Sequence, residues 1–560
     1  MQKPLQSVQK WLMYLWPGLL SLGFIALILG FAFNGLFSEI TNIDLTRIFQ
    51  NNYLFRVIGF TFFQAALSTL LATLVAIPVA RALARRPTLP GRQIFVQLAS
   101  LSLIIPTIVG VFGIVAIHGR NGWLNQFLSL FDVNAGNYLY GLTGILIAHV
   151  FFNAPLLSRI FLQSLEALPP EYWRNTAQLG MTGKDIFRLI EWPLLRRIIP
   201  ASCGLVFLLC FTSFAVVLAL GGGPSTNTLE VAIYQAIRFD FDIPKAVILS
   251  LAQLSLCFIL LIIGSKFARH ITLQKTEERS IQRLDARHTS AKITDSLALL
   301  VMVFLVIPPL LATIWKAFSP RLITIITDEK LWIASFNSLL ISLTAGCIAL
   351  ILAIGIALML RSLQSPYRLG RHSLASSFAT MTDLSGSIIL LLPPFVLATG
   401  LFITFRAATS LTILAPFLVI IVNALMTLPF ILRILVPAFE TSAQKSDHLC
   451  DNLDINGLNR IRIIDWPQNR KALGLALGLS VALSTGDLSV IALFGTQDFT
   501  TLPLLMFQKM GSYRLDDAAI TALFLCLQSL MLFIFIERTI SGKGFSLSTL
   551  RTSRKAMHCA

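Results

Sequence analysis

The chain has 560 residues, of which 55% are hydrophobic and only 13% are charged, and its mean hydropathy is +0.77. Soluble domains carry about a quarter of charged residues, so this composition excludes a soluble globular protein. The formal net charge of +17 is compatible with binding to nucleic acid or with a membrane protein, and the placement of the cations decides between the two.

Apolar runs of the length that crosses a bilayer, about 20 residues, recur along the whole chain. Only α-helices and closed barrels satisfy backbone hydrogen bonds in lipid, and uninterrupted apolar runs fit helices. The sequence therefore predicts an all-α polytopic protein embedded in a lipid bilayer, with about 12 transmembrane helices. In chain order, the predicted helices lie near residues 12–34, 57–80, 94–117, 141–163, 198–220, 246–266, 296–316, 336–360, 386–405, 411–437, 472–494 and 518–537.

Lys and Arg gather in alternate loops between these helices. They precede the first predicted helix and follow the second, fourth, sixth, eighth and twelfth, whereas the opposite loops are richer in Asp and Glu. The positive-inside rule then places both termini in the cytoplasm. This pattern favours a membrane protein over a nucleic-acid-binding one. The apolar run from Trp11 to Phe33 is too long for a signal peptide, so we expect an uncleaved first helix.

A charged stretch divides the chain into two halves. We expect a first membrane repeat at residues 1–267, a cytoplasmic linker at 268–294, a second membrane repeat at 295–538 and a basic cytoplasmic tail at 539–560. No C-x-x-C pair occurs, so the cysteines indicate neither a disulfide framework nor a metal site.

The two halves carry the same polar segment. Residues 176–197 read TAQLGMTGKDIFRLIEWPLLRR, and residues 450–471 read CDNLDINGLNRIRIIDWPQNRK. The offset is 274 residues, as from Pro193 to Pro467. Because both copies keep the same order and sidedness, the sequence predicts two parallel repeats of six helices, related by an axis along the membrane normal. This disfavours the inverted repeats of many secondary transporters.

Each copy of the segment is predicted to form a short helix, a turn and a second helix that leads to Trp-Pro. The turns lie at 180–183 and at 456–457, and the proline suits the first turn of the next membrane helix. A helix–turn–helix whose apolar face is formed by Phe187, Leu189 and Ile190 suits insertion into a groove of a partner protein. The alternative is that both segments pack on the chain itself, but the duplicated apolar face and flanking cations favour docking.

The chain carries no recognisable site for ATP. No G-x-x-x-x-G-K-[ST] loop occurs, since Gly542-Lys543 lacks the upstream glycine and is followed by Gly544. No convergent acid–base or metal-binding constellation appears either, so we expect no catalytic residues and no cofactor in this chain. If transport uses ATP, its hydrolysis takes place on another chain.

Ionisable residues inside predicted membrane helices are the first candidates for a substrate pathway. Asp487 is the strongest, because a buried carboxylate can face a cationic substrate, although it can equally cap a helix break beside Gly486. His149 and its counterpart Asn423 are further candidates, for which a hydrogen bond between helices is the simpler explanation. Phe214, which we match to Asp487, can stack on an aromatic cation or simply pack in the core.

The repeated segment resembles the EAA loop of inner-membrane permeases of ABC importers, whose pattern has a glycine and, ten residues later, an isoleucine followed by x-x-Pro. Gly180, Ile190 and Pro193 match this pattern, whereas residues 174–176 read RNT in place of Glu-Ala-Ala and Asp454 replaces the glycine in the second copy. The resemblance implies a type I (MetI-like) permease fold, with coupling loops at 164–197 and 438–471. The ATPase-coupling residues that it implies are Ala177, Gly180, Gly183, Ile190, Pro193, Leu453, Asp454, Gly457, Ile464 and Pro467.

The whole chain more narrowly resembles the fused-dimer permeases for thiamine, which are related to iron(III) permeases. The likeness lies chiefly in the stretches GILIAHVFFNAPLLSR, AQLGM, EWPLLRR, ALGGGPSTNTLEVAIYQAI and GSYRLDDAAITAL. It implies a multi-pass subunit of the bacterial inner membrane that carries thiamine and its phosphates. The implied partners are a periplasmic substrate-binding protein and a homodimeric ABC ATPase, which would hold ATP and Mg²⁺.

Two other functions stay open at this point. An iron(III) ABC permease shares every architectural feature and differs only in its substrate. A proton-coupled secondary transporter is a different class, and it would transport without an ATPase partner.

Overall fold

The computed structural model describes residues 3–39, 52–101, 104–132, 136, 138–223, 226–267, 283–364, 392–406, 411–453, 455 and 457–542. These residues form helices joined by turns and loops and contain no β-strand, which confirms the predicted all-α class. The first half contains α1 (Lys3–Ser38), α3 (Asn52–Arg85), α4 (Arg92–Leu101), α5 (Thr107–His118), α6 (Trp123–Ser129), α7 (Leu142–Glu166), α8 (Pro170–Gln178), α9 (Gly183–Ile186), α10 (Trp192–Phe211), α11 (Ala215–Leu220), α12 (Leu229–Arg238) and α13 (Ile243–Phe267). The second half contains α14 (Thr289–Ala317), α15 (Leu322–Ile326), α16 (Glu329–Gln364), α19 (Pro394–Phe405), α20 (Leu411–Asn452), α21 (Gly457–Arg460), α22 (Trp466–Thr485), α23 (Ser489–Phe494), α24 (Leu502–Gly511) and α25 (Leu515–Ser541).

Ten helices of the described residues are long and apolar enough to cross a membrane. The other two predicted spans are not single long helices. The span near 94–117 is split into α4 and α5 at Pro106, whose backbone is extended (φ −53°, ψ 133°) and which has no N–H to donate. Of the span near 386–405, the structure describes the 12-residue helix α19, which begins after Pro393. A helix of this length reaches only part of the way across a bilayer.

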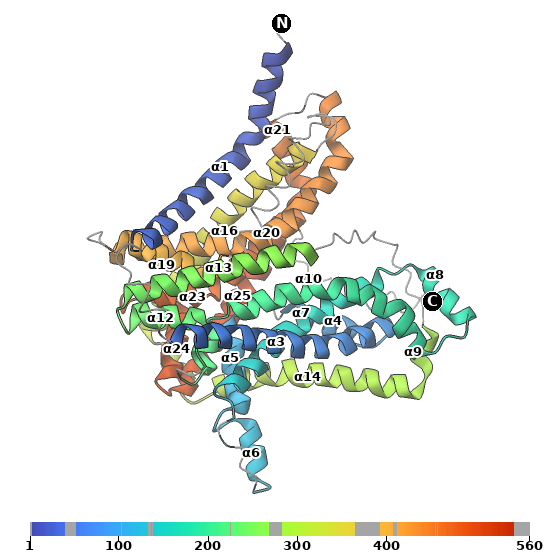
Figure 1. The fold of residues 1–560 in the computed structure, drawn as a ribbon, viewed down its shortest axis with the longest axis vertical. Coiled ribbons are helices and arrows are strands. Elements are labelled where there is room, and N and C mark those ends of the chain that lie inside the picture. The colour runs from blue at the N-terminus through green and yellow to red at the C-terminus, as the bar shows by residue number, and fades with distance from the viewer. Residues whose placement is uncertain are drawn as a thin grey trace.

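The first helix of each repeat packs on the opposite repeat. Helix α1 contacts α16 and α19 of the second half, whereas α14 contacts α3 and α5 of the first half. Figure 1 shows the resulting arrangement, with α1 running beside α16 and with α14 lying along the group that contains α3. The repeat boundaries predicted from the sequence therefore do not enclose two separate bodies in space.

Small residues allow α1 to approach α19 closely. A Cβ atom added at Gly35 would lie 2.2 Å from the carbonyl oxygen of Gly400, and one at Gly400 would lie 2.2 Å from the carbonyl oxygen of Ala32. The hydroxyl of Thr404 donates a hydrogen bond of 2.7 Å to the carbonyl of Phe31 across the same crossing. Close approach at glycines with hydrogen bonds between helices is how membrane helices associate.

The two halves differ where their coupling loops begin. In the first half α7 ends at Glu166 and α8 starts at Pro170. Pro169, which lies between them, has an extended backbone (φ −57°, ψ 143°). The residue before a proline is pushed out of the helical region, so this Pro-Pro pair separates the two helices. The counterpart of Pro169 in the second repeat is Ala443, a strong helix former, and α20 continues through it to Asn452.

We predict that Gly35→Val destabilises the protein and that Gly30→Val, in the same helix, does not. A side chain at position 35 must displace backbone of α19, which costs about 1–3 kcal/mol, whereas a Cβ at Gly30 meets nothing within 4 Å. Thermal unfolding of the purified protein in detergent measures the difference. Equal melting temperatures for the two variants would contradict the close packing of α1 on α19.

Candidate transport pathway and coupling segments

A cavity of about 330 Å³ lies where the membrane helices of both halves meet. The faces of α7 and α20 line two of its sides, and the segments that join α10 to α11, α22 to α23 and α4 to α5 line the rest. All four residues that the sequence singled out for a substrate pathway line this cavity, namely His149, Phe214, Asn423 and Asp487. The structure thus brings together residues from both repeats.

Two helix breaks at matching positions shape this cavity. Helix α10 ends at Phe211 and α11 begins at Ala215, and α22 ends at Thr485 and α23 begins at Ser489. Both pairs of ends keep the offset between Pro193 and Pro467, so the break is part of the repeat. Irregular backbone at membrane depth is tolerated where it lines a cavity.

This register corrects one match made from the sequence. The residue that immediately precedes α11 is Phe214, and the one that precedes α23 is Leu488. The counterpart of Asp487 is therefore Ser213 and not Phe214. The match of Asp487 with Phe214 uses an offset of 273 residues. The coupling loops and the two helix breaks share an offset of 274 residues, so that match is one position out of register.

Asp487 both lines the cavity and caps a helix. Its carboxylate accepts hydrogen bonds from the backbone N–H groups of Ser489 (3.2 Å) and Val490 (3.3 Å), at the start of α23. A carboxylate at a helix N-terminus satisfies otherwise unpaired donors and faces the positive end of the helix dipole. The two roles considered for Asp487 from the sequence are therefore compatible in one side chain.

His149 and Asn423 make the expected hydrogen bonds between helices. The Nδ1 atom of His149 lies 2.9 Å from the hydroxyl of Ser68, and the side-chain amide of Asn423 donates to the hydroxyl of Ser484 at 3.0 Å. Within the described part of the chain, His149 Nε2 and Asn423 Oδ1 have no hydrogen-bond partner. Each residue thus keeps one polar atom that a substrate or water can use.

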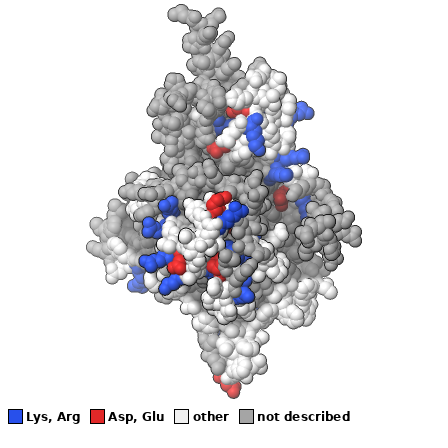
Figure 2. All heavy atoms as spheres, turned by 90° about the vertical axis from the view of Figure 1, so that its right-hand side faces the viewer, with Lys and Arg blue, Asp and Glu red and all other residues white. Residues whose placement is uncertain are grey.

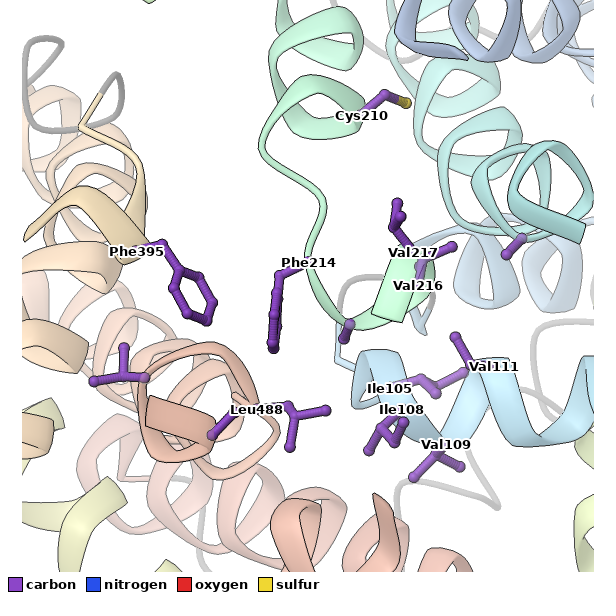
Figure 3. Packing of buried hydrophobic residues seen from close by; sticks show 14 of the residues in the cluster. Ile105, Ile108, Val109, Val111, Cys210, Phe214, Val216, Val217, Phe395 and Leu488 are labelled. Carbon is purple, nitrogen blue, oxygen red and sulfur yellow. The ribbon is translucent and has the colours of Figure 1, made fainter. Parts of the chain in front are cut away.

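Aromatic side chains close the cavity on the side away from the coupling loops. The ring of Phe214 lies 4.2 Å from that of Phe395 and 5.3 Å from that of Tyr234, as centroid distances. Figure 3 shows Phe214 directed toward Phe395 and Leu488. These four side chains are all buried, so packed apolar groups fill the space beyond the cavity on this side.

The opposite side of the cavity is more open. The cavity-lining side chains nearest the coupling loops, Leu156 on α7 and Phe430 on α20, are partly exposed. The two coupling loops themselves lie apart, with α8 and α9 at one end of the molecule and α21 at another (Figure 1). Among the described residues, buried apolar side chains thus cover the cavity beside Phe214, and partly exposed ones line it on the side of the coupling loops.

Both coupling loops enter the membrane through a short π-helix at the same position. It spans Phe187–Glu191 in the first loop and Ile461–Asp465 in the second, and the following tryptophan donates its backbone N–H to the carbonyl five residues earlier. Pro193 and Pro467 come next in the chain. A proline ring clashes with the carbonyl four residues earlier, so the wider π turn is the local solution in both copies.

A glycine turn precedes this π-helix in the first loop. Gly180 has a left-handed backbone (φ +59°), and the N–H of Met181 bonds to the carbonyl of Thr176 at 3.1 Å. This is the glycine-terminated helix end known as the Schellman motif. In the second loop the N–H of Ile455 bonds to the carbonyl of Cys450 at 2.9 Å, so the same closure recurs at the corresponding place.

The other predicted coupling residues are distributed over the surface and the interior. Ala177 and Gly180 are exposed and Gly183 is half-buried, while Gly457 is exposed and left-handed (φ +59°). Asp454 lies outside the described residues.

Exposed apolar side chains repeat between the two loops. Leu179 is 75% exposed and its counterpart Leu453 is 60% exposed, and Leu189 is 63% exposed and its counterpart Ile463 is 60% exposed. Figure 2 shows the side of the molecule that carries α8 and α9, where Lys and Arg outnumber acidic side chains. The two loops thus carry exposed apolar side chains at corresponding positions, as surfaces that bind other proteins do.

Only part of the apolar face predicted for the first loop faces outward. Leu189 is exposed, but Phe187 packs against Trp192, with ring centroids 5.9 Å apart, and lies 4.2 Å from the guanidinium of Arg81. Ile190 is half-buried. Pro193 is half-buried, Pro467 is exposed, and Ile464 is buried. The exposed patch is therefore smaller than the sequence suggests.

Buried ion pairs, which the sequence analysis missed, anchor both loops to the membrane helices. The carboxylate of Glu191 accepts from Arg81 of α3 at 2.6 Å, and that of Asp465 pairs with Arg361 of α16 at 2.7 Å. Both carboxylates immediately precede Trp-Pro and are at most 1% exposed. The acidic residue that precedes Trp-Pro in both copies is the feature of the sequence from which these ion pairs could have been predicted. In the first half the arginine of α3 that pairs with Glu191 is Arg81, whereas Arg85 of the same helix pairs with Asp285 and Asp295.

Comparison with known proteins agrees with this architecture. A family profile described as "Binding-protein-dependent transport system inner membrane component" matches residues 76–273. The thiamine transport system permease protein ThiP of Brucella abortus (strain 2308) is 39% identical over 493 residues, which are 88% of this chain and 89% of that protein. ThiP of Escherichia coli (strain K12) is 38% identical over 525 residues, 94% of this chain and 96% of that protein. ThiP of Haemophilus influenzae is 39% identical over 521 residues, 93% and 95% of the two chains.

These similarities confirm the type I permease fold and the class of function expected from the sequence. The matched profile describes an inner-membrane component, and the described helices that can cross a bilayer make it a multi-pass one. The relatives are permease subunits and match nearly the whole chain, so the protein is a transport subunit and not an enzyme in its own right. The chain belongs to the family of thiamine transport system permease proteins, the membrane permeases of ABC importers.

Proposed function

We propose that this chain forms the membrane pathway of an ATP-driven importer of thiamine and its phosphates. The observation that carries this proposal is the similarity to thiamine transport permeases at 38–39% identity over about nine-tenths of both chains. The iron(III) alternative has no such support. Thiamine would be released toward the cytoplasm through the cavity between the two repeats.

The chemistry of the cavity suits an aromatic cation. Thiamine carries a positively charged thiazolium ring and an aromatic pyrimidine ring. Asp487 supplies a carboxylate, and the unpaired atoms of His149 and Asn423 supply polar contacts. Phe214 and Phe152 supply aromatic surface against which a cation is stabilised. The volume of about 330 Å³ lies at the lower end of the range for small-molecule pockets, about 300–1,000 Å³.

The two coupling loops would dock two copies of one ATPase subunit, which hold ATP and Mg²⁺. The support is the repeated patch of Leu179 and Leu189 in the first loop and of Leu453 and Ile463 in the second. We place these loops and both termini in the cytoplasm of a bacterial cell, in line with the positive-inside rule. A periplasmic substrate-binding protein would deliver thiamine on the opposite face, beyond Phe214.

ATP-driven approach of the two ATPase subunits would move the coupling loops together. Because Arg81 and Arg361 hold the loops on α3 and α16, this motion would pass to the membrane helices as rigid bodies. The cavity would then close on the cytoplasmic side, and the cluster of Phe214, Tyr234 and Phe395 would separate to admit substrate.

The class and the substrate are tested together by uptake of labelled thiamine. Cells that lack this chain regain uptake when it is supplied with its ATPase and binding protein, and lose it again with an ATPase that cannot hydrolyse ATP. Uptake that persists with the inactive ATPase and collapses with an uncoupler would indicate a proton-coupled transporter. If the chain restores uptake of ferric iron but not of thiamine, the substrate is iron(III).

Gly180→Pro should abolish uptake while the protein still inserts in the membrane. The ring of proline fixes φ at a negative value, so proline cannot adopt the left-handed backbone of Gly180 and the turn before the π-helix is lost. Gly180→Asn is the matched control, because asparagine tolerates this conformation. Wild-type uptake by the proline variant, at a normal membrane level, would refute the coupling role of this loop.

Asp487→Asn separates the charge of this residue from its capping role. Ser489 and Val490 donate to different oxygens of Asp487, and asparagine keeps one oxygen that accepts from one of them, but it removes the negative charge that faces the cavity. We expect uptake of thiamine to fall by roughly tenfold or more, because a desolvated charge pair with the substrate is lost, with little change in thermal stability. Undiminished uptake would show that Asp487 acts only as a helix cap.

A further inference from the structure

A guanidinium group from the linker between the repeats contacts the first coupling loop. Arg283 lies just before the 3₁₀ turn Leu284–Arg287, and its side chain is 3% exposed. It donates hydrogen bonds to Glu191 at 2.7 Å and to Asp285 at 3.0 and 2.9 Å, and its guanidinium lies 4.0 Å from the ring centroid of Trp173 in α8. It therefore bridges the first helix of the coupling loop and the junction where the loop enters the membrane.

In the second coupling loop, an arginine of the loop itself makes the corresponding bridge. Arg460, the last residue of α21, is 1% exposed. It donates a hydrogen bond to Asp447 of α20, and its Nε lies 3.7 Å from the carboxylate of Asp465. Here too a buried guanidinium joins the helix that precedes the turn to the carboxylate that precedes Trp-Pro.

The two bridges connect the same pair of positions in the repeat. Trp173 corresponds to Asp447, and Glu191 corresponds to Asp465. The residue that corresponds to Arg460 in the first loop is Ile186, which has no charge to offer. The first loop thus lacks a bridging cation of its own, and the structure supplies one from a segment 92 residues further along the chain.

We propose that Arg283 is a positioning residue of the first coupling loop, supplied by the linker in place of the arginine that the second loop carries itself. This inference rests on the proposed function, since it assigns Arg283 to a loop that transmits the work of an ATPase. It makes the linker a part of the coupling machinery and not only a tether between two repeats.

The charges around Arg283 support a fixed geometry. Asp285 is 5% exposed, and burial alone would raise its pKa, but its hydrogen bond with Arg283 and the charges of Arg283, Arg85 and Arg81 lower that pKa below the usual value. Asp285 therefore stays ionised and holds two N–H groups of the guanidinium. Without Arg283, Glu191 keeps Arg81 but loses its link to α8.

The test compares single variants with a restoring double variant in the complete transporter. Uptake of labelled thiamine is measured with the ATPase and binding protein present, and it is normalised to the amount of each variant in the membrane. We expect Arg283→Ala to lower the maximal rate by at least about tenfold, because the first coupling loop loses the guanidinium that links Glu191 to Trp173 of α8. The thiamine concentration for half-maximal uptake should stay unchanged, since substrate is delivered on the opposite face.

Ile186→Arg in the Arg283→Ala background should restore most of the rate, because it places the cation where the second loop has it. Lys292→Ala, an exposed cation at the start of α14, is the matched control and should transport like the wild type. The inference is overturned if Arg283→Ala transports normally, or if its loss is not restored by Ile186→Arg. Failure of the wild-type protein itself to transport thiamine with an active ATPase would instead refute the proposed function.

Discussion

The buried ion pair at each Trp-Pro junction is the interaction on which the rest of the structure depends. Glu191 and Asp465 sit at the C-terminal end of a π-helix that a following proline imposes, and arginines of α3 and α16 neutralise them. An uncompensated carboxylate at these buried positions would cost several kcal/mol, so the pairs fix where each coupling loop meets the membrane helices. A loop fixed in this way transmits a displacement, whereas a loosely attached one would absorb it.

The exchange of first helices adds a second constraint on movement. Helix α1 packs on the second half, and α14 packs on α3 and α5 of the first half as well as on α25 of its own, so both helices link the movements of the two repeats. The glycines at the crossing of α1 and α19 bring the two backbones into contact, which favours movement of whole groups of helices over bending within one. The asymmetry lies in the linker, whose Arg283 serves only the first loop.

The cavity follows from the same repeat. Two helix breaks at corresponding positions turn irregular backbone toward one central space, and only there does a membrane protein tolerate it. The repeat is not symmetric in chemistry, since Asp487 of the second repeat corresponds to Ser213 of the first. The cavity therefore carries a carboxylate from one repeat only, an asymmetry that two identical subunits could not provide.

The sequence by itself determined the membrane class, most of the spans, the offset of the repeat and the Trp-Pro entry points, because these depend on composition and on local patterns. It also selected His149, Asn423 and Asp487, since ionisable and polar groups stand out in apolar helices. Only the tertiary structure decided that these residues share one cavity, that the first helices are exchanged and that Arg283 serves a loop 92 residues away. Such contacts join segments far apart in the chain, and no local pattern records which of many arginines meets which carboxylate.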